Sequence, residues 1–266
     1  TEDNSCNPRV LWIHGPPGTG KSVLSSFIIR HLKQTEIGCQ FYFFRFGDQR
    51  KTSLNAFLRS LAYQIASDVP EYRQSIAKFS EDGLNLEKAE SRLIWQKLFV
   101  STLFKLSLSR PLFWIIDALD EADSPQALLN LFSAIAKSGL SIRIVFVSRR
   151  NKLLSLNFER LATSVSVELI SADDFKDDLQ LYVTKEMQYM HGSPEFKEHV
   201  IATVLKLAGG NFLWVHLVLK EILQCHTEAE VEQALIEVPS ELEPLYHRME
   251  AALLKYSRPA DKDLLK

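Results

Sequence analysis

A glycine-rich stretch has the residue types and spacing of a phosphate-binding loop. Residues 15–22 read Gly-Pro-Pro-Gly-Thr-Gly-Lys-Ser, which matches the complete pattern G-x-x-x-x-G-K-[ST]. In such loops backbone N–H groups surround a polyphosphate, the lysine reaches its terminal phosphates, and the final hydroxyl ligates Mg²⁺. The sequence therefore predicts a nucleoside triphosphate site formed by Gly15, Pro16, Pro17, Gly18, Thr19, Gly20, Lys21, Ser22 and Val23.

Acidic residues follow a second apolar segment. Residues 112–116 are apolar and lead directly into Asp117. A carboxylate at the end of a buried strand can complete a Mg²⁺ site together with Ser22. Asp120 or Glu121 would then orient or deprotonate the attacking water. The alternative is a strand-to-loop transition that carries a solvated acidic cluster.

Cations follow a third apolar segment. Residues 144–147 are apolar and are followed by Ser148, Arg149 and Arg150. If this strand ends beside the phosphate site, Arg149 can sense or neutralise the γ-phosphate. The alternative is that both arginines solvate a loop.

Strand-like and helix-like segments alternate around these residues. Apolar runs predict strands at residues 10–13, 39–46, 111–117, 142–147 and 165–169. Helical spacing predicts helices after Ser22 and over 54–65, 87–106 and 125–138, with a short one near 72–79. We expect a parallel sheet covered on both faces, with the aromatic strand 39–46 at its centre.

The pattern changes after about Ser171. Only helices are predicted there, at residues 173–190, 194–207, 211–224, 228–236 and 241–256. His216 lies in the apolar part of the third of these and is interpreted as a core or interface histidine. The predicted fold class is therefore α/β: a P-loop NTPase parallel sheet flanked by helices, followed by a small helical domain.

Composition narrows the function classes. The chain has 266 residues, 46% of them hydrophobic, and a net charge of −2, which gives no general attraction to nucleic acid or to an anionic membrane. Its three cysteines form no C-x-x-C pair, so neither a disulfide framework nor a zinc site is indicated. No run has the length of a membrane-spanning helix. We expect a cytoplasmic protein.

Four segments in this order resemble the NACHT domain of fungal NOD-like receptors, which belong to the STAND class of signalling ATPases. They are the phosphate loop, Phe-Phe-Arg-Phe with Leu-Arg-Ser-Leu-Ala-Tyr-Gln-Ile, Ile-Ile-Asp-Ala-Leu-Asp-Glu-Ala, and Phe-Val-Ser-Arg-Arg. The resemblance covers about residues 9–240. It implies that Asp117 completes the metal site, that Asp120 and Glu121 serve hydrolysis, and that Arg149 is a sensor.

The resemblance also implies a domain order and a mode of action. Residues 1–170 would be the NACHT α/β domain, 171–238 a small helical domain, and 239–266 the start of a winged-helix domain. Phe212 stands where the family usually has a proline that packs on the base. The cofactors would be ATP or ADP, with GTP as the alternative, and Mg²⁺. Such receptors hydrolyse slowly, exchange ADP for ATP, and self-associate when a sensor region outside this chain detects its ligand; their effector also lies outside it.

Two other functions compete with a switch. One is a motor or loader ATPase of the AAA+ type that turns over continuously on nucleic acid or protein; the near-neutral charge argues against it. The other is a binding module that holds nucleotide only as structure. The presence of Lys21, Ser22, Asp117 and Asp120 argues against a degenerate site.

Overall fold

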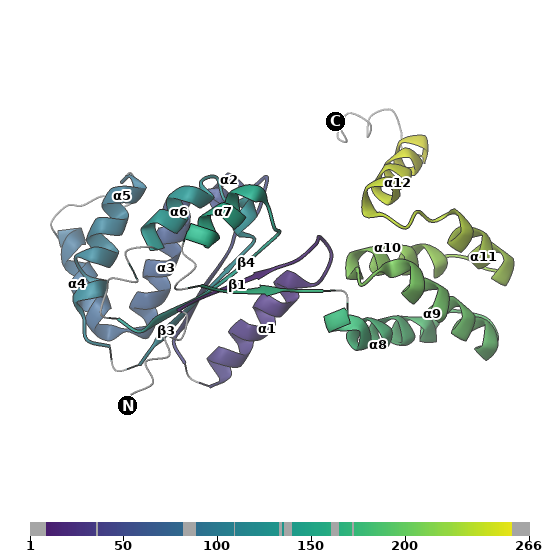
Figure 1. Ribbon diagram of the computed structural model, residues 1–266, viewed down its shortest axis with the longest axis horizontal. Coiled ribbons are helices and arrows are strands. Elements are labelled where there is room, and N and C mark those ends of the chain that lie inside the picture. Colours follow the sequence, from purple (N-terminus) through teal and green to yellow (C-terminus); the bar gives the residue numbers. More distant parts are fainter. Residues whose placement is uncertain are drawn as a thin grey trace. The chain divides into compact units, whose positions relative to one another are not determined.

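The computed structural model describes residues 9–35, 37–81, 89–108, 110–132, 135, 140–160, 165–171 and 173–256. The chain divides into two compact units (Figure 1). The first contains Thr1–Pro16 and Lys21–Ile170, and the second contains Pro17–Gly20 and Ser171–Lys266. The middle of the phosphate loop therefore groups with the helical unit, and its two ends group with the sheet.

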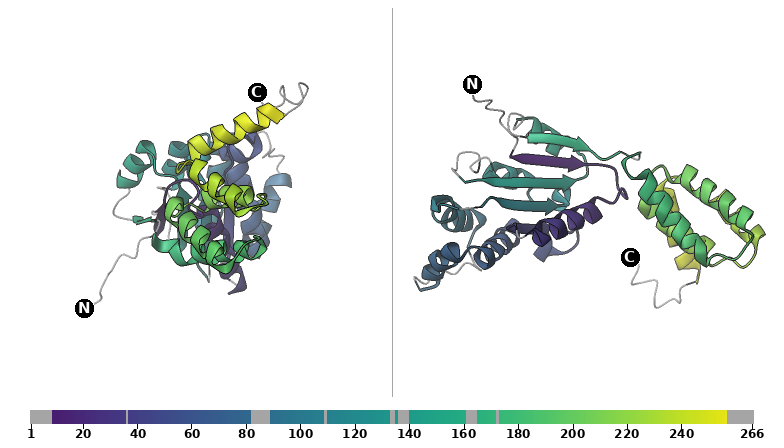
Figure 2. Two further views of the ribbon diagram at one scale, coloured as in Figure 1. Left: turned by 90° about the vertical axis from the view of Figure 1, so that its right-hand side faces the viewer. Right: turned by 90° about the horizontal axis from the view of Figure 1, so that it is seen from below.

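The first unit is built on a parallel sheet. Its strands lie in the order β2-β3-β4-β1-β5, and neighbouring strands pair in parallel. The right-hand view of Figure 2 shows these strands side by side. The sheet confirms the predicted α/β fold class. The strands are β1 (Val10–His14), β2 (Cys39–Phe43), β3 (Leu112–Asp117), β4 (Ile142–Ser148) and β5 (Val165–Leu169).

Helices cover both faces of this sheet. Alternation along β3 turns Ile115 toward Ile29 of α1 (Lys21–Gln34), and turns Trp114 and Ile116 into the larger core on the opposite face. Figure 1 shows α1 apart from the other helices of the unit, across the sheet. The helices on the larger-core side include α3 (Leu54–Asp68), α4 (Pro70–Glu81), α5 (Ser91–Ile94), α6 (Pro125–Phe132) and α7 (Lys152–Arg160), with the short α2 (Gln49–Thr52) before them.

The prediction that the aromatic strand is central and spans residues 39–46 is wrong. β2 ends at Phe43 and occupies one edge of the described sheet. The side chain of Gln64 substitutes for a missing neighbouring strand, since its Oε1 accepts from Phe41 N at 3.0 Å and its Nε2 donates to Phe41 O at 2.9 Å. An edge strand protected in this way can carry aromatic residues without offering a free backbone to another chain.

The single helix predicted over residues 87–106 is also wrong. The chain forms α5, then a π-helix over Trp95–Val100, then a 3₁₀ turn over Leu103–Lys105. Within the π-helix, Trp95 and Phe99 stack with ring centroids 4.7 Å apart, and both belong to the larger core. The helix α4 is longer than predicted, and α7 was not predicted. The predicted end of the helix over residues 125–138 lies outside the described residues.

The second unit is helical, as predicted. Trp214 and Val215 are fully buried at its centre, and Leu245 belongs to the same core. In the part of the chain that the structure describes, no helix is both long and apolar enough to cross a membrane. The helices are α8 (Lys176–Glu186), α9 (Pro194–Ala208), α10 (Phe212–Ile222), α11 (Glu228–Glu237) and α12 (Leu242–Tyr256).

Candidate nucleotide-binding site

The two ends of the phosphate loop extend from β1 and into α1. Lys21 is the first residue of α1, and its Nζ donates to the carbonyl oxygen of Gly15 at 2.9 Å and to that of Pro16 at 2.5 Å. Burial lowers the pKa of Lys21. These carbonyl groups hold the ammonium at the loop, where phosphate oxygens can replace them as partners.

The middle of the loop contacts the first turn of α10. Gly18 has a φ of +79°, and its carbonyl oxygen accepts from Phe212 N at 2.8 Å. Asn211 Nδ2 donates to Pro17 O at 3.3 Å. A Cβ on Gly18 would lie 2.0 Å from Asn211 Oδ1, so no other residue fits this position without movement.

Asn211 also caps α10. Its Oδ1 accepts from Trp214 N at 3.0 Å. We expect Asn211→Ala to lower the free energy of unfolding by about 1 kcal/mol, because one helix N–H loses its partner. Urea denaturation followed by circular dichroism measures this. Asn211→Asp keeps the capping oxygen but loses the donor to Pro17 O, so it should recover only part of the loss. Equal midpoints for alanine and wild type would contradict the prediction.

Asp117 is held by two serines of α1. It follows Ile116 at the end of β3, so it points to the α1 face, as Ile115 does. Ser22 Oγ donates to Asp117 Oδ2 at 2.5 Å, and Ser25 Oγ donates to Oδ1 at 2.9 Å. Burial raises the pKa of Asp117, and the bonds from the two serines oppose that rise. Ser25 was not among the predicted site residues, although its position one turn after Ser22 places both on one helix face.

The donors at this point fit a magnesium ion. Mg²⁺ prefers oxygen ligands and keeps several of its waters, so one or two protein groups are sufficient. The hydroxyl of Ser22 and the carboxylate of Asp117 are adjacent oxygens of this kind. Across the described ranges no group of three or more His, Cys, Asp or Glu could hold a metal ion. The geometry suits a metal that nucleotide phosphates help to bind.

A second charged group forms after β3 and β4. Asp120 Oδ1 accepts from Arg149 N at 3.0 Å, and Asp120 Oδ2 lies 3.6 Å from Arg149 Nε. Glu121 Oε1 lies 3.8 Å from Arg149 Nη2, and Glu121 Oε2 accepts from Phe46 N at 2.7 Å. Ala118, with a left-handed φ of 54°, turns the chain so that both acids reach this position. Three predicted residues thus meet at the carboxyl edge of the sheet.

His14, which precedes the phosphate loop, and Arg150, which follows Arg149, bond or pack outside this charged group. His14 is buried, and its ring centroid lies 4.7 Å from that of Trp12. Burial is the main cause that lowers the pKa of His14. Arg150 Nε donates to Ser155 Oγ on α7 at 3.3 Å. Arg149 and Arg150 therefore point to different partners.

Phe212 lines a small cavity within the helical unit. The cavity has a volume of about 400 Å³ and is bounded by Gly18, Gly20, Tyr182, Phe212, Leu213 and His216. Tyr182 Oη and His216 Nδ1 are 3.0 Å apart. Of the two alternatives for His216, a core position is wrong, because its side chain is exposed and pairs with Tyr182 at this rim. An interface position stays a prediction. Val23, in the first unit, is 73% exposed.

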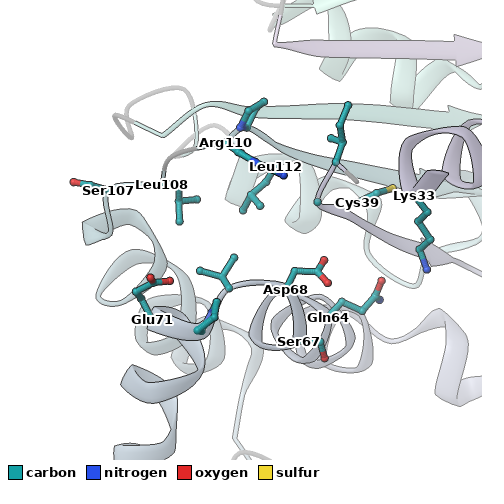
Figure 3. A pocket seen from close by; sticks show the side chains of 15 residues that line it. Lys33, Cys39, Gln64, Ser67, Asp68, Glu71, Ser107, Leu108, Arg110 and Leu112 are labelled. Carbon is teal, nitrogen blue, oxygen red and sulfur yellow. The ribbon is translucent and has the colours of Figure 1, made fainter. Parts of the chain in front are cut away.

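A larger cleft lies at the opposite edge of the sheet (Figure 3). Its volume is about 850 Å³, and it includes Cys39 and Leu112, the first residues of β2 and β3. Asp68 and Gln64 of α3 line its other wall. Burial raises the pKa of the Cys39 thiol to about 11. None of the residues that line it is a predicted nucleotide residue, and ligands of parallel sheets bind at the carboxyl edge.

Comparison with known proteins now assigns the family. Residues 1–149, more than half of the chain, match the family model described as "Nephrocystin 3, N-terminal". The chain belongs to the nephrocystin-3 N-terminal family. Vegetative incompatibility protein HET-E-1 of Podospora anserina is 28% identical over 254 residues, which cover 91% of this chain and 18% of that protein. This member of the nephrocystin-3 N-terminal family thus spans under a fifth of that relative. Together the matches confirm a fungal NACHT domain.

A solved structure supports the fold. The ORC1 protein of Aeropyrum pernix in complex with DNA is 13% identical, with a TM-score of 0.51. The alignment covers 85% of this chain and 59% of that one. At this identity the likeness shows the fold alone. The family member described here therefore has a P-loop NTPase fold, in agreement with its phosphate loop.

Proposed function

We propose that this chain is the nucleotide-binding part of a signalling switch that binds ATP with Mg²⁺ and hydrolyses it slowly. One observation carries the proposal: the hydroxyl of Ser22 in the phosphate loop is hydrogen bonded to Asp117 at the end of β3. This pair joins the two parts of a P-loop metal site in one compact unit. The intact pair argues against a degenerate loop that has lost its metal-binding groups.

Each charged residue then has a role. Lys21 would bind the β- and γ-phosphates, and Ser22 and Asp117 would hold Mg²⁺. When bound, Mg²⁺ would neutralise charge on those phosphates. Asp120 would orient the attacking water or accept its proton, with Glu121 as the alternative, and Arg149 would stabilise charge on the γ-phosphate.

The helical unit would respond to the nucleotide. Phe212 and the cavity beside it offer an aromatic surface for the base, next to Gly18 and Gly20 of the loop. We retain the assignment of residues 171–238 to a small helical domain and of 239–266 to the start of a winged-helix domain. The name of the Podospora relative points to a signalling role, and exchange of ADP for ATP would drive self-association.

Nucleotide content and turnover of the purified chain test this proposal. We expect ADP or ATP to co-purify, and turnover on the order of 10⁻² per second or slower, as in unassisted nucleotide switches. Parallel assays with GTP identify the preferred base, which we propose to be adenine. Fast turnover stimulated by DNA or RNA would favour a motor or loader, and binding without any turnover would favour a structural nucleotide.

A further inference from the structure

The two serine hydroxyls that donate to Asp117 differ in their surroundings. Ser22 is exposed at the loop, whereas Ser25 is 0% exposed beneath it, and Asp117 itself is only 2% exposed. Ser25 and Ser22 are three residues apart on α1, so their side chains lie on one face and reach the two oxygens of the same carboxylate.

The hydroxyl of Ser25 has a choice of acceptors. Its Oγ is 2.9 Å from Asp117 Oδ1 and 3.2 Å from Lys21 O, and a hydroxyl has one proton to donate. The carboxylate is the nearer acceptor, and hydrogen bonds to ionised groups are the stronger kind. The structure therefore assigns this proton to Asp117.

The two serines cannot have the same task. The proposed metal site uses the oxygen of Ser22 as a ligand, so its bond to Asp117 depends on what occupies the site. The bond from Ser25 does not depend on it. The backbone N–H of Ala118 also bonds to this carboxylate. Without Ser25, Oδ1 would lose its buried hydroxyl partner, and fewer bonds would oppose rotation of the carboxylate about its broad, roughly two-fold torsion.

We propose that Ser25 is a positioning residue that fixes the carboxylate of Asp117 in the orientation required for Mg²⁺. This inference rests on the proposed function, because it concerns the same metal site. It separates two roles on one helix: Ser22 contacts the metal, and Ser25 acts only through Asp117.

Metal-dependent nucleotide binding tests the proposal. Affinity of the 266-residue chain for a fluorescent ATP analogue is measured over a series of free Mg²⁺ concentrations and in EDTA. For Ser25→Ala we expect the half-saturating Mg²⁺ concentration to rise about tenfold, as for loss of one charge-assisted hydrogen bond. Affinity in EDTA should stay within about twofold, because the phosphate contacts of Lys21 need no metal.

Ser26→Ala is the matched control. Ser26 is the next residue, is exposed, and its Oγ donates to Ser22 O at 2.8 Å. Its substitution should leave the Mg²⁺ dependence unchanged. Ser25→Thr keeps the hydroxyl and should show most of the wild-type Mg²⁺ dependence. If Ser25 only filled space, keeping the hydroxyl would not preserve this dependence.

The outcomes are separable. A Mg²⁺ dependence of Ser25→Ala within twofold of wild type overturns the proposal. Equal loss of affinity with Mg²⁺ and with EDTA also overturns it, since that pattern indicates a general structural role. If wild type binds nucleotide with the expected Mg²⁺ dependence but shows no turnover, hydrolysis fails while the role of Ser25 stands. If wild type binds no nucleotide, both fail.

Discussion

Lys21→Ala is expected to weaken ATP binding by about a hundredfold or more, as loss of a preorganised phosphate donor does. Lys21 is the cation at the mouth of the loop, and its Nζ is held by the carbonyl oxygens of Gly15 and Pro16. Alanine removes the charge without disturbing the helix, because it is the best helix former. Titration with a fluorescent ATP analogue in the presence of Mg²⁺ measures the effect.

Lys33→Ala is the control for loss of a cation from the same helix. Lys33 is exposed near the end of α1, and its Nζ lies 4.6 Å from the ring centroid of Phe41. We expect its ATP affinity to stay within about twofold of wild type. Retention of wild-type affinity by Lys21→Ala would show that the loop does not bind triphosphate in the expected way.

Asp120→Asn is expected to lower the rate of hydrolysis by about 10² to 10³, with ATP affinity changed only a few-fold. Asparagine keeps an oxygen that can accept from Arg149 N, so the local turn should persist. It removes the charge that would orient or deprotonate water and that lies 3.6 Å from Arg149 Nε. Single-turnover phosphate release, combined with equilibrium binding, separates the two effects.

Asp123→Asn is the matched substitution for this test. Asp123 is an exposed acid in the same turn, and its backbone N donates to Thr52 O at 3.0 Å. Its rate should equal that of wild type. If Asp120→Asn loses binding and hydrolysis together, Asp120 supports the site rather than the reaction. An unchanged rate would assign the role to Glu121.

The phosphate loop and the ends of its neighbouring strands could be predicted because their signals are local. Glycine, lysine and serine at fixed spacing describe the loop, and an apolar strand that ends in Asp117 or Arg149 describes the sheet edge. In a parallel sheet these ends meet at one edge, so local patterns imply a common site. The structure brings Asp120, Glu121 and Arg149 together there.

Other features depend on partners far away in the sequence. The aromatic residues of β2 are typical of a central strand, but Gln64 of α3 closes that edge through two bonds to Phe41. The π-helix over Trp95–Val100 fits a core that no local pattern describes. The rim formed by Tyr182 and His216 joins residues 34 positions apart.

The sequence by itself determined that this chain has a P-loop NTPase fold, and which residues are candidates for phosphate, metal and water. These follow from residue type and short spacing, which set backbone freedom and charge. Only the tertiary structure decided that Ser25 shares Asp117 with Ser22, that Arg149 pairs with both acids, and that Gly18 requires the space beside Asn211. A hydrogen bond needs two groups within about 3 Å, and which distant groups meet is set by packing.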